Sequence, residues 1–173
     1  FAQKVGETLP AWEKGYMDIH HINTGCGECA YIILPDGTTM LIDAGENKAG
    51  NPRHVSPKPN ASRTPGEWIV DYIKTMAPVQ KQKLDYALIT HFHSDHMGGV
   101  LKMKNESGRY YNTGIITVAE NLQIGMLVDR GFPDYDYLVN TEDRMIKNYF
   151  NFLHFTKRKI NVEQFVPGMD NQF

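Results

Sequence analysis

The chain has 173 residues and a formal net charge of −2, from 18 Lys and Arg against 20 Asp and Glu. Hydrophobic residues make up 41% and charged residues 22%, a balance typical of a globular domain that excludes a wholly disordered chain. The near-neutral charge removes the simplest argument for a protein that coats nucleic acid, two cysteines are too few for a disulfide-rich scaffold, and no apolar run reaches the roughly 20 residues that span a membrane.

The first part of the chain carries little pattern. Residues 1–15 have no clear periodicity and are predicted to be a leader or loop, followed by one domain over residues 16–173. Phe1-Ala2-Gln3 is compatible with the end of a cleaved secretory signal, so an exported and a cytoplasmic location both stay open.

Paired strands are predicted next. Residues 16–24, 30–34 and 38–42 are rich in β-branched and apolar side chains, which predicts three strands. Pro35-Asp36-Gly37 separates the last two, with Pro presetting φ and Gly accepting a positive φ, so these two strands should form a β-hairpin.

A long loop and a well-marked helix follow. Residues 46–63 hold several Pro, Asn and basic residues with no apolar pattern, which predicts a long surface loop. Thr64 then provides a helix N-cap, Pro65 the first helical position and Glu67 the acid of a capping box, and the helix should stop before Pro78. Residues 84–90 are predicted to be a buried strand.

The second half predicts a strand at residues 115–119, an amphipathic helix at 142–159 and a strand at 162–166. This last strand has no later partner in the sequence, which predicts that the domain continues beyond residue 173. Paired strands ahead of alternating helices and strands indicate a mixed α/β sandwich.

Three of the seven histidines and one aspartate fall within six residues, as His91, His93, Asp95 and His96. His91 and His93 are two residues apart at a strand end, so their imidazoles project to the same side and can bind one ion. Asp95 and His96 lie past the bend and can face a second ion. Imidazole and carboxylate ligands suit Zn²⁺, Mn²⁺ or Fe better than Mg²⁺ or Ca²⁺, so the cluster predicts a transition-metal site.

Residues 90–99 (THFHSDHMGG) resemble the metal-binding motif of the metallo-β-lactamase-fold hydrolases. Residues 23–30 (NTGCGECA), 35–39 (PDGTT) and 41–45 (LIDAG) are similar to the ComEC-type branch of that superfamily, named after a DNA-uptake competence protein. The resemblance covers residues 16–100 well and the remainder loosely. Cys26 and Glu28 stand where branch members often carry another polar residue and an acid.

The resemblance implies a four-layer αββα sandwich, of which this chain would hold the first half to two thirds, and a dinuclear site, with zinc expected and Mn or Fe as alternatives. By position, His91 and His93 match ligands of the first metal, and Asp95 and His96 those of the second. Asp43 matches a family residue that supports these ligands without touching the ions, although a strand-to-loop cap is an alternative role for it. The remaining family ligands have no matching motif here.

The expected function is therefore hydrolysis, with Asp95 orienting a metal-activated water and a phosphodiester favoured as substrate. A β-lactam, lactone or thioester stays open because fold does not determine function, and the net charge does not support nucleic acid as a partner. The competing class is a non-catalytic metal-binding or interaction domain with an incomplete site. Oligomeric state is left open.

Three further points stay open. Arg130, in the polar turn of residues 129–133, is a candidate contact for an anionic substrate, with a structural ion pair as the alternative. Cys26 and Cys29 form a C-x-x-C, interpreted as an incidental thiol pair, disulfide-linked if exported, in preference to a redox site. Further metal ligands have to come from elsewhere, and spacing singles out none of the remaining candidates, which are His20, His21, His54, His154 and Asp170.

Overall fold

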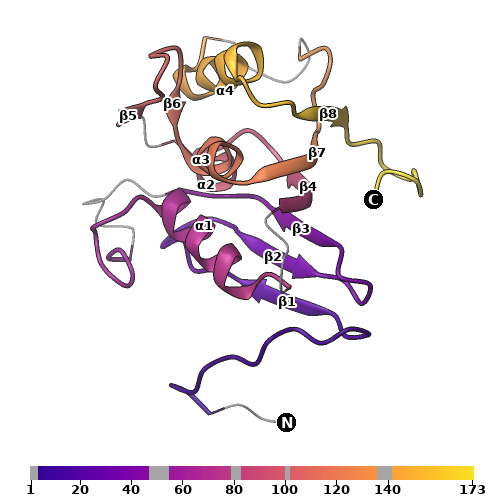
Figure 1. The fold of residues 1–173 in the computed structure, drawn as a ribbon. Coiled ribbons are helices and arrows are strands. Elements are labelled where there is room, and N and C mark those ends of the chain that lie inside the picture. Colours follow the sequence, from indigo (N-terminus) through magenta and orange to yellow (C-terminus); the bar gives the residue numbers. More distant parts are fainter. Residues whose placement is uncertain (1–3, 47–54, 79–82, 100–101, 136–141) are drawn as a thin grey trace.

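In a computed structural model, the described part of the chain forms a six-stranded mixed sheet with helices packed against it (Figure 1). The structure describes residues 4–46, 55–78, 83–99, 102–135 and 142–173. The six strands lie in the order β1-β2-β3-β4-β7-β8, and a separate two-stranded ribbon pairs β5 with β6. The bounds of the strands are β1 Asp18–His21, β2 Ala30–Ile33, β3 Thr39–Ile42, β4 Lys83–Ile89, β5 Met103–Lys104, β6 Tyr111–Asn112, β7 Gln123–Asp129 and β8 Asn161–Gln164.

The sheet is antiparallel at one end and parallel at the other. β1, β2 and β3 form an antiparallel meander, and the β2–β3 hairpin predicted from Pro35-Asp36-Gly37 is confirmed. β3, β4, β7 and β8 are all parallel, so each of these connections has to cross from one end of the sheet to the other. The crossovers contain α1 (Pro65–Met76), α2 (Ser94–Met97) with α3 (Gly114–Asn121), and α4 (Arg144–Phe155).

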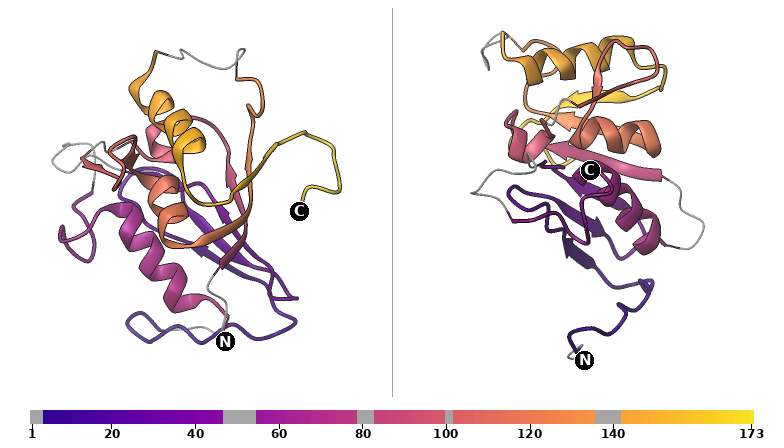
Figure 2. Two further views of the ribbon diagram at one scale, coloured as in Figure 1. Left: turned by 45° about the horizontal axis from the view of Figure 1, so that its top comes forward. Right: turned by 90° about the vertical axis from the view of Figure 1, so that its left-hand side faces the viewer.

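The three longer helices cover one face of the sheet. The parallel strands advance in one direction, and right-handed crossovers then place α1, α3 and α4 on the same side, as the left view of Figure 2 shows. Tyr31, Leu41, Ala87 and Leu127 form a row across four neighbouring strands and are fully buried beneath this layer. The architecture is therefore a mixed α/β sandwich, as predicted, with one sheet and one helix layer in the described residues.

The opposite face carries a second row of apolar side chains that are only partly buried, namely Ile32, Met40, Tyr86 and Met126. The C-terminal segment lies against this face, where the ring of Phe173 contacts Tyr86 edge-on at 5.6 Å. No helix in the described part of the chain is long and apolar enough to cross a membrane.

Helix α1 begins as its sequence predicts. The Thr64 hydroxyl accepts from the backbone N–H of Glu67, and the Glu67 carboxylate accepts from the backbone N–H of Thr64, which completes the capping box. Helix α4 is also confirmed but is shorter at both ends, with Asp143 as its N-cap.

The strand predicted at residues 115–119 is wrong, because this segment forms helix α3. Its β-branched side chains favour a strand locally, but Ile115, Ile116 and Val118 are fully buried between α1 and the sheet. The next strand, β7, runs parallel to β4, and a parallel neighbour requires a crossover that returns the chain to the starting edge. The tertiary requirement overrides the local preference.

β7 itself and the β5–β6 ribbon were not predicted.

The final strand has a partner after all. β8 pairs in parallel with the earlier strand β7, with Leu127 opposite Val162 and Asp129 opposite Gln164. The expectation that this strand needs a later partner is therefore wrong, since it joins the existing sheet as an edge strand.

Candidate metal centre

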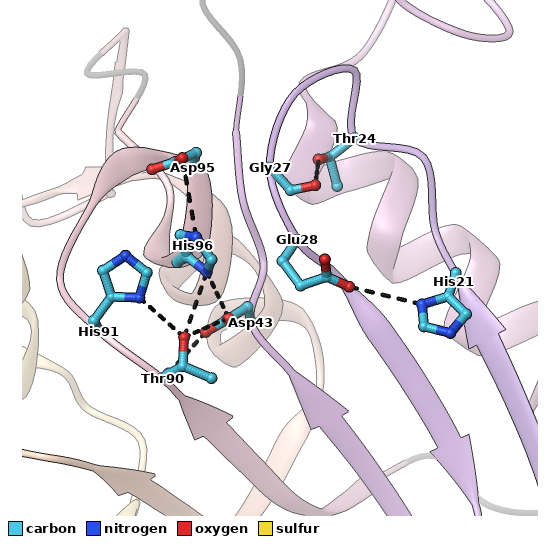
Figure 3. A network of polar contacts seen from close by, with 9 residues as sticks. All are labelled: His21, Thr24, Gly27, Glu28, Asp43, Thr90, His91, Asp95 and His96. Carbon is cyan, nitrogen blue, oxygen red and sulfur yellow. Dashed lines mark hydrogen bonds and ion pairs between the residues drawn. The ribbon is translucent and has the colours of Figure 1, made fainter.

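The predicted site residues gather at one edge of the sheet, where β1, β3, β4 and β7 end and β2 begins. His91, His93, Asp95 and His96 follow the last residue of β4, and Asp43 follows the last residue of β3. Because β3 and β4 are parallel neighbours, with Ile42 opposite Leu88, their carboxyl ends bring these two segments together. Figure 3 shows Asp43, Thr90, His91, Asp95 and His96 joined by a network of polar contacts at this edge.

Asp43 is the centre of the hydrogen-bond network. Its side chain is 1% exposed, and its carboxylate accepts from the Thr90 backbone N–H at 2.8 Å and from the Thr90 hydroxyl at 2.7 Å. The same Oδ2 lies 2.7 Å from His96 Nδ1. Asp43 also has a left-handed backbone, with φ of +59°, which Asp tolerates better than most residues. It therefore does more than cap a strand.

This network sets the tautomers of two imidazoles. A carboxylate only accepts, so His96 carries its proton on Nδ1 and leaves the lone pair of Nε2 available to a metal. The single proton of the Thr90 hydroxyl goes to Asp43, so Thr90 Oγ1 accepts from His91 Nδ1 at 3.1 Å. His91 then also presents Nε2 to a ligand.

The three imidazole rings form a compact group. The His91 ring centroid lies 3.8 Å from that of His96 and 4.8 Å from that of His93. Burial, followed by the neighbouring His96 and His93, lowers the pKa of His91, and the carboxylates of Asp43 and Asp95 oppose this effect. Neutral imidazole is the form that binds a metal, so the surroundings of His91 favour its ligand state.

The four side chains are close together but not arranged as a chelating set. His96 Nε2 and Asp95 Oδ2 are 3.9 Å apart, and within the described residues no group of three or more His, Cys, Asp or Glu is placed so that it could hold one ion. The His91 and His96 rings pack against each other. The side chains would have to rotate to turn these donors toward a common ion, and the chemistry of the donors suits Zn²⁺.

Two loops hold the Asp95 segment through its backbone. The Asp95 carbonyl accepts from Glu28 N–H at 2.9 Å, and the Ser94 and His96 carbonyls accept from Glu46 at 3.1 Å and Ala44 at 2.7 Å. Glycine is needed where these loops approach, because a Cβ on Gly27 would lie 2.2 Å, and one on Gly45 2.1 Å, from the Asp95 carbonyl oxygen.

The C-x-x-C lies in this glycine loop and has no redox geometry. Both thiols are free, with Cys26 exposed and Cys29 in the hydrophobic core. Burial raises the pKa of Cys29 well above its usual range, with Asp43 and Glu28 adding to the effect, so this thiol is protonated and unreactive at neutral pH.

The other candidate ligands lie in different places. His20 lies against helix α1, with its Nδ1 3.1 Å from the Tyr72 hydroxyl, while His154, near the end of α4, and Asp170, in the C-terminal segment, are exposed. His21 lies at the functional edge, with Nδ1 3.7 Å from Glu28 Oε1, as an exposed ion pair next to the site (Figure 3). His54 lies outside the described residues.

Arg130 is exposed directly after β7, and its neighbour Asp129 is in register with Ile89 of β4. It therefore lies at the same edge as the histidines. A cavity of about 250 Å³, by contrast, is at the other end of α3. It is lined by Glu120 and Asn121 and by the turn between β5 and β6, and no residue of the histidine cluster lines it.

Two features escaped the sequence interpretation. The role of Thr90 had a sequence signal, a hydroxyl residue directly before His91, but its partner Asp43 is 47 positions away. The buried network around Asp129, described below, joins residues 20 positions apart and had no comparable signal.

Comparison with known proteins agrees with this geometry. No curated protein matches the chain. A family model does: residues 23–108, just under half of the chain, match the model described as the metallo-beta-lactamase superfamily. The part of the chain that contains the glycine loop, Asp43 and the histidine cluster therefore has the sequence pattern of the metallo-beta-lactamase superfamily.

Proposed function

We propose that this protein is a metal-dependent hydrolase of the metallo-β-lactamase fold, with His91, His93, Asp95 and His96 as metal ligands. The observation that carries the proposal is the contact between Asp43 and His96, with Thr90 between Asp43 and His91. A carboxylate behind a metal-binding imidazole is the usual support of such ligands, because it fixes the ring and raises its basicity.

The residues divide into three roles. His91, His93 and His96 supply neutral nitrogen donors, and Asp95, whose side chain is 49% exposed, supplies a carboxylate open to solvent. Asp43 and Thr90 hold the imidazoles. When bound, a zinc ion would supply a water of lowered pKa and a positive charge next to the substrate oxygen, and two ions are proposed.

Asp95 is the proposed catalytic group. Its backbone is fixed by contacts from Glu28 and by the close approach of Gly27 and Gly45, while its carboxylate remains accessible. A carboxylate held in this way can accept a hydrogen bond from a nucleophilic water and keep that water oriented toward substrate.

A phosphodiester is the proposed substrate class. The similarity of the glycine loop and of residues 35–45 to the ComEC-type branch supports it, and Arg130 at the same edge offers a guanidinium to a phosphate oxygen. The net charge of −2 argues for a small phosphodiester over extended nucleic acid. Turnover of a chromogenic phosphodiester is compared with turnover of a chromogenic β-lactam, a lactone and a thioester. Absence of phosphodiester turnover would by itself rule out this substrate class.

The decisive experiment measures bound metal and hydrolysis together. Purified wild type, His93→Ala and His154→Ala are compared by elemental analysis and by phosphodiester turnover. His154 is an exposed histidine on α4, so its variant is a matched control. His93→Ala should lose metal and activity, and His154→Ala should keep both. Full metal content in His93→Ala would overturn the assignment.

A non-catalytic metal-binding domain is the second candidate. It is favoured by the finding that, in the described residues, no three donor groups are arranged around one ion. The same elemental analysis separates the two: two ions per chain with turnover supports the hydrolase, and one ion without turnover on any substrate supports the binding domain.

A further inference from the structure

A buried carboxylate lies next to the histidine cluster but outside the ligand set. Asp129 is the last residue of β7, is fully buried, and is in register with Ile89, the last residue of β4 before the cluster. Because β7 is the neighbour of β4 in the sheet (Figure 1), Asp129 lies at the functional edge, one strand away from the segment that carries the histidines.

The carboxylate is held by four donors. Oδ1 accepts from the backbone N–H groups of Gly131 and Phe132, both at 2.8 Å. Oδ2 accepts from the hydroxyls of Tyr135 at 2.9 Å and Tyr149 at 2.8 Å. Since burying a carboxylate is costly without hydrogen bonds, this complete set of donors explains how Asp129 is tolerated in the core.

Both tyrosines remain donors across the physiological range. Burial raises the pKa of Tyr135 and of Tyr149, and the neighbouring Asp129 raises both further. Both hydroxyls therefore keep their protons at neutral pH and stay available as donors to Asp129.

The two tyrosine rings meet a residue of the metal motif. Phe92 is 6% exposed, and its ring centroid lies 5.9 Å from that of Tyr135 and 5.7 Å from that of Tyr149. Phe92 stands between His91 and His93. Because the Phe92 ring is packed in the core, it holds the backbone of residues 91–93 in place. The side chains of His91 and His93 extend from this same short segment.

We propose that Asp129, Tyr135 and Tyr149 are positioning residues that set the His91 and His93 pair through Phe92. This inference rests on the proposed function, because it assigns the three residues a role in metal affinity. Groups behind metal ligands typically change affinity by about 10- to 100-fold, and the intervening Phe92 places these residues near the lower figure.

The test is metal affinity in variants that remove one hydroxyl. Tyr149→Phe keeps the ring against Phe92 but takes one donor from Asp129 Oδ2. Tyr110→Phe is the matched control, because Tyr110 is also a buried tyrosine that packs against Phe152, and its hydroxyl donates to Glu120, away from the cluster. Zinc affinity is measured by competition with a chromogenic chelator, and the cobalt-substituted protein gives the visible absorption of the bound ion.

Tyr149→Phe should weaken zinc binding about tenfold and alter the cobalt absorption, while Tyr110→Phe should leave affinity within about twofold of wild type. Phe92→Leu removes the ring contact and leaves Asp129 satisfied, so it should show the same loss even if Tyr149→Phe does not fold. Wild-type affinity and absorption in both Tyr149→Phe and Phe92→Leu would overturn the positioning role alone. A wild-type protein that takes up neither zinc nor cobalt would overturn the proposed function and this role with it.

Discussion

Asp43 Oδ2 lies 2.7 Å from Nδ1 of His96, across a gap of 53 positions in the sequence. The contact joins the end of β3 to the turn of α2, and Thr90 at the end of β4 bonds the same carboxylate. One buried acid therefore connects three segments that converge at the site, and it does so with hydrogen bonds that orient imidazoles. The same contact orients a proposed metal ligand and joins elements of the fold. A substitution at Asp43 should therefore lower both the metal affinity and the stability of the protein.

Asp43→Asn is expected to weaken zinc binding by about 10- to 100-fold and to destabilise the protein by about 1–3 kcal/mol. Asparagine tolerates the left-handed backbone, so the loss comes from replacing an acceptor oxygen with an N–H that faces other donors. Chelator competition and chemical denaturation measure the two effects.

Asp36→Asn is the control for this variant. Asp36 also accepts from the backbone and the hydroxyl of one threonine, Thr38, but in an exposed hairpin turn far from the cluster. Its variant should bind zinc as the wild type does. Equal zinc affinity in Asp43→Asn and Asp36→Asn would contradict the role of Asp43.

Gly27→Ala should be more destabilising than Gly15→Ala. Both glycines have a positive φ, +133° and +96°, so alanine is strained at either position. Only at Gly27 would the new Cβ meet a backbone atom, the Asp95 carbonyl oxygen at 2.2 Å, whereas Gly15 has nothing within 4 Å.

Strain alone should cost Gly15→Ala about 1–2 kcal/mol, and the collision should add about 1–3 kcal/mol for Gly27→Ala. Because the collision falls on Asp95, Gly27→Ala should also lower phosphodiester turnover, and Gly15→Ala should not. Equal unfolding free energies for the two variants would argue against the tight approach of the glycine loop to α2.

His20 should make stability depend on pH in mildly acidic solution. Burial lowers its pKa, with the nearby Asp18 opposing this, and the ring is enclosed by Tyr31 and by Tyr72, whose hydroxyl lies 3.1 Å from Nδ1. The unfolded chain, with a His pKa near 6.5, then binds more protons than the folded one. Stability should therefore fall as pH drops below about 6.5 toward the folded-state pKa.

His20→Asn retains an acceptor for Tyr72 and should make stability depend less on pH below about 6.5. The free energy of unfolding is measured by urea denaturation with a chelator present, between pH 7.5 and pH 5, which is about the range where His titrates. Part of the slope should remain, because the pKa of His91 is also lowered. His154→Asn, at an exposed histidine, should keep the wild-type slope. An unchanged slope in His20→Asn would contradict the assignment.

Thr64→Ala should destabilise the protein by about 1 kcal/mol without changing zinc affinity. The substitution removes the capping-box acceptor at the start of α1, which packs against the sheet and α3 and contributes no residue to the histidine cluster. Thr64→Ser keeps the hydroxyl and should restore most of the loss. Thermal unfolding measures the effect, and a parallel fall in zinc affinity would show that α1 and the site are coupled.

The sequence allowed a correct prediction where local hydrogen bonding and turn chemistry specify the structure. The capping residues before α1 and the turn between β2 and β3 lie within a few positions of the feature that they specify. Local hydrogen bonding and backbone preference determine such features. The metal site predicted from the spacing of the histidines stays a prediction.

Local signals misled where packing decides. The β-branched residues 115–118 favour a strand in isolation, and they form a helix because the parallel pairing of β4 with β7 needs a buried crossover. Residues 161–164 do form a strand, but its partner is the earlier strand β7, with which it pairs in parallel at the edge of the existing sheet.

The sequence by itself determined which side chains are proposed as metal ligands, since His91, His93, Asp95 and His96 lie within six positions whatever the fold does. Only the tertiary structure decided what holds them: Asp43 behind His96, Gly27 and Gly45 against Asp95, and Asp129 with its tyrosines behind Phe92. The physical reason is the register of the parallel strands, which brings the ends of β3, β4 and β7 to one edge and so joins residues that no local pattern relates.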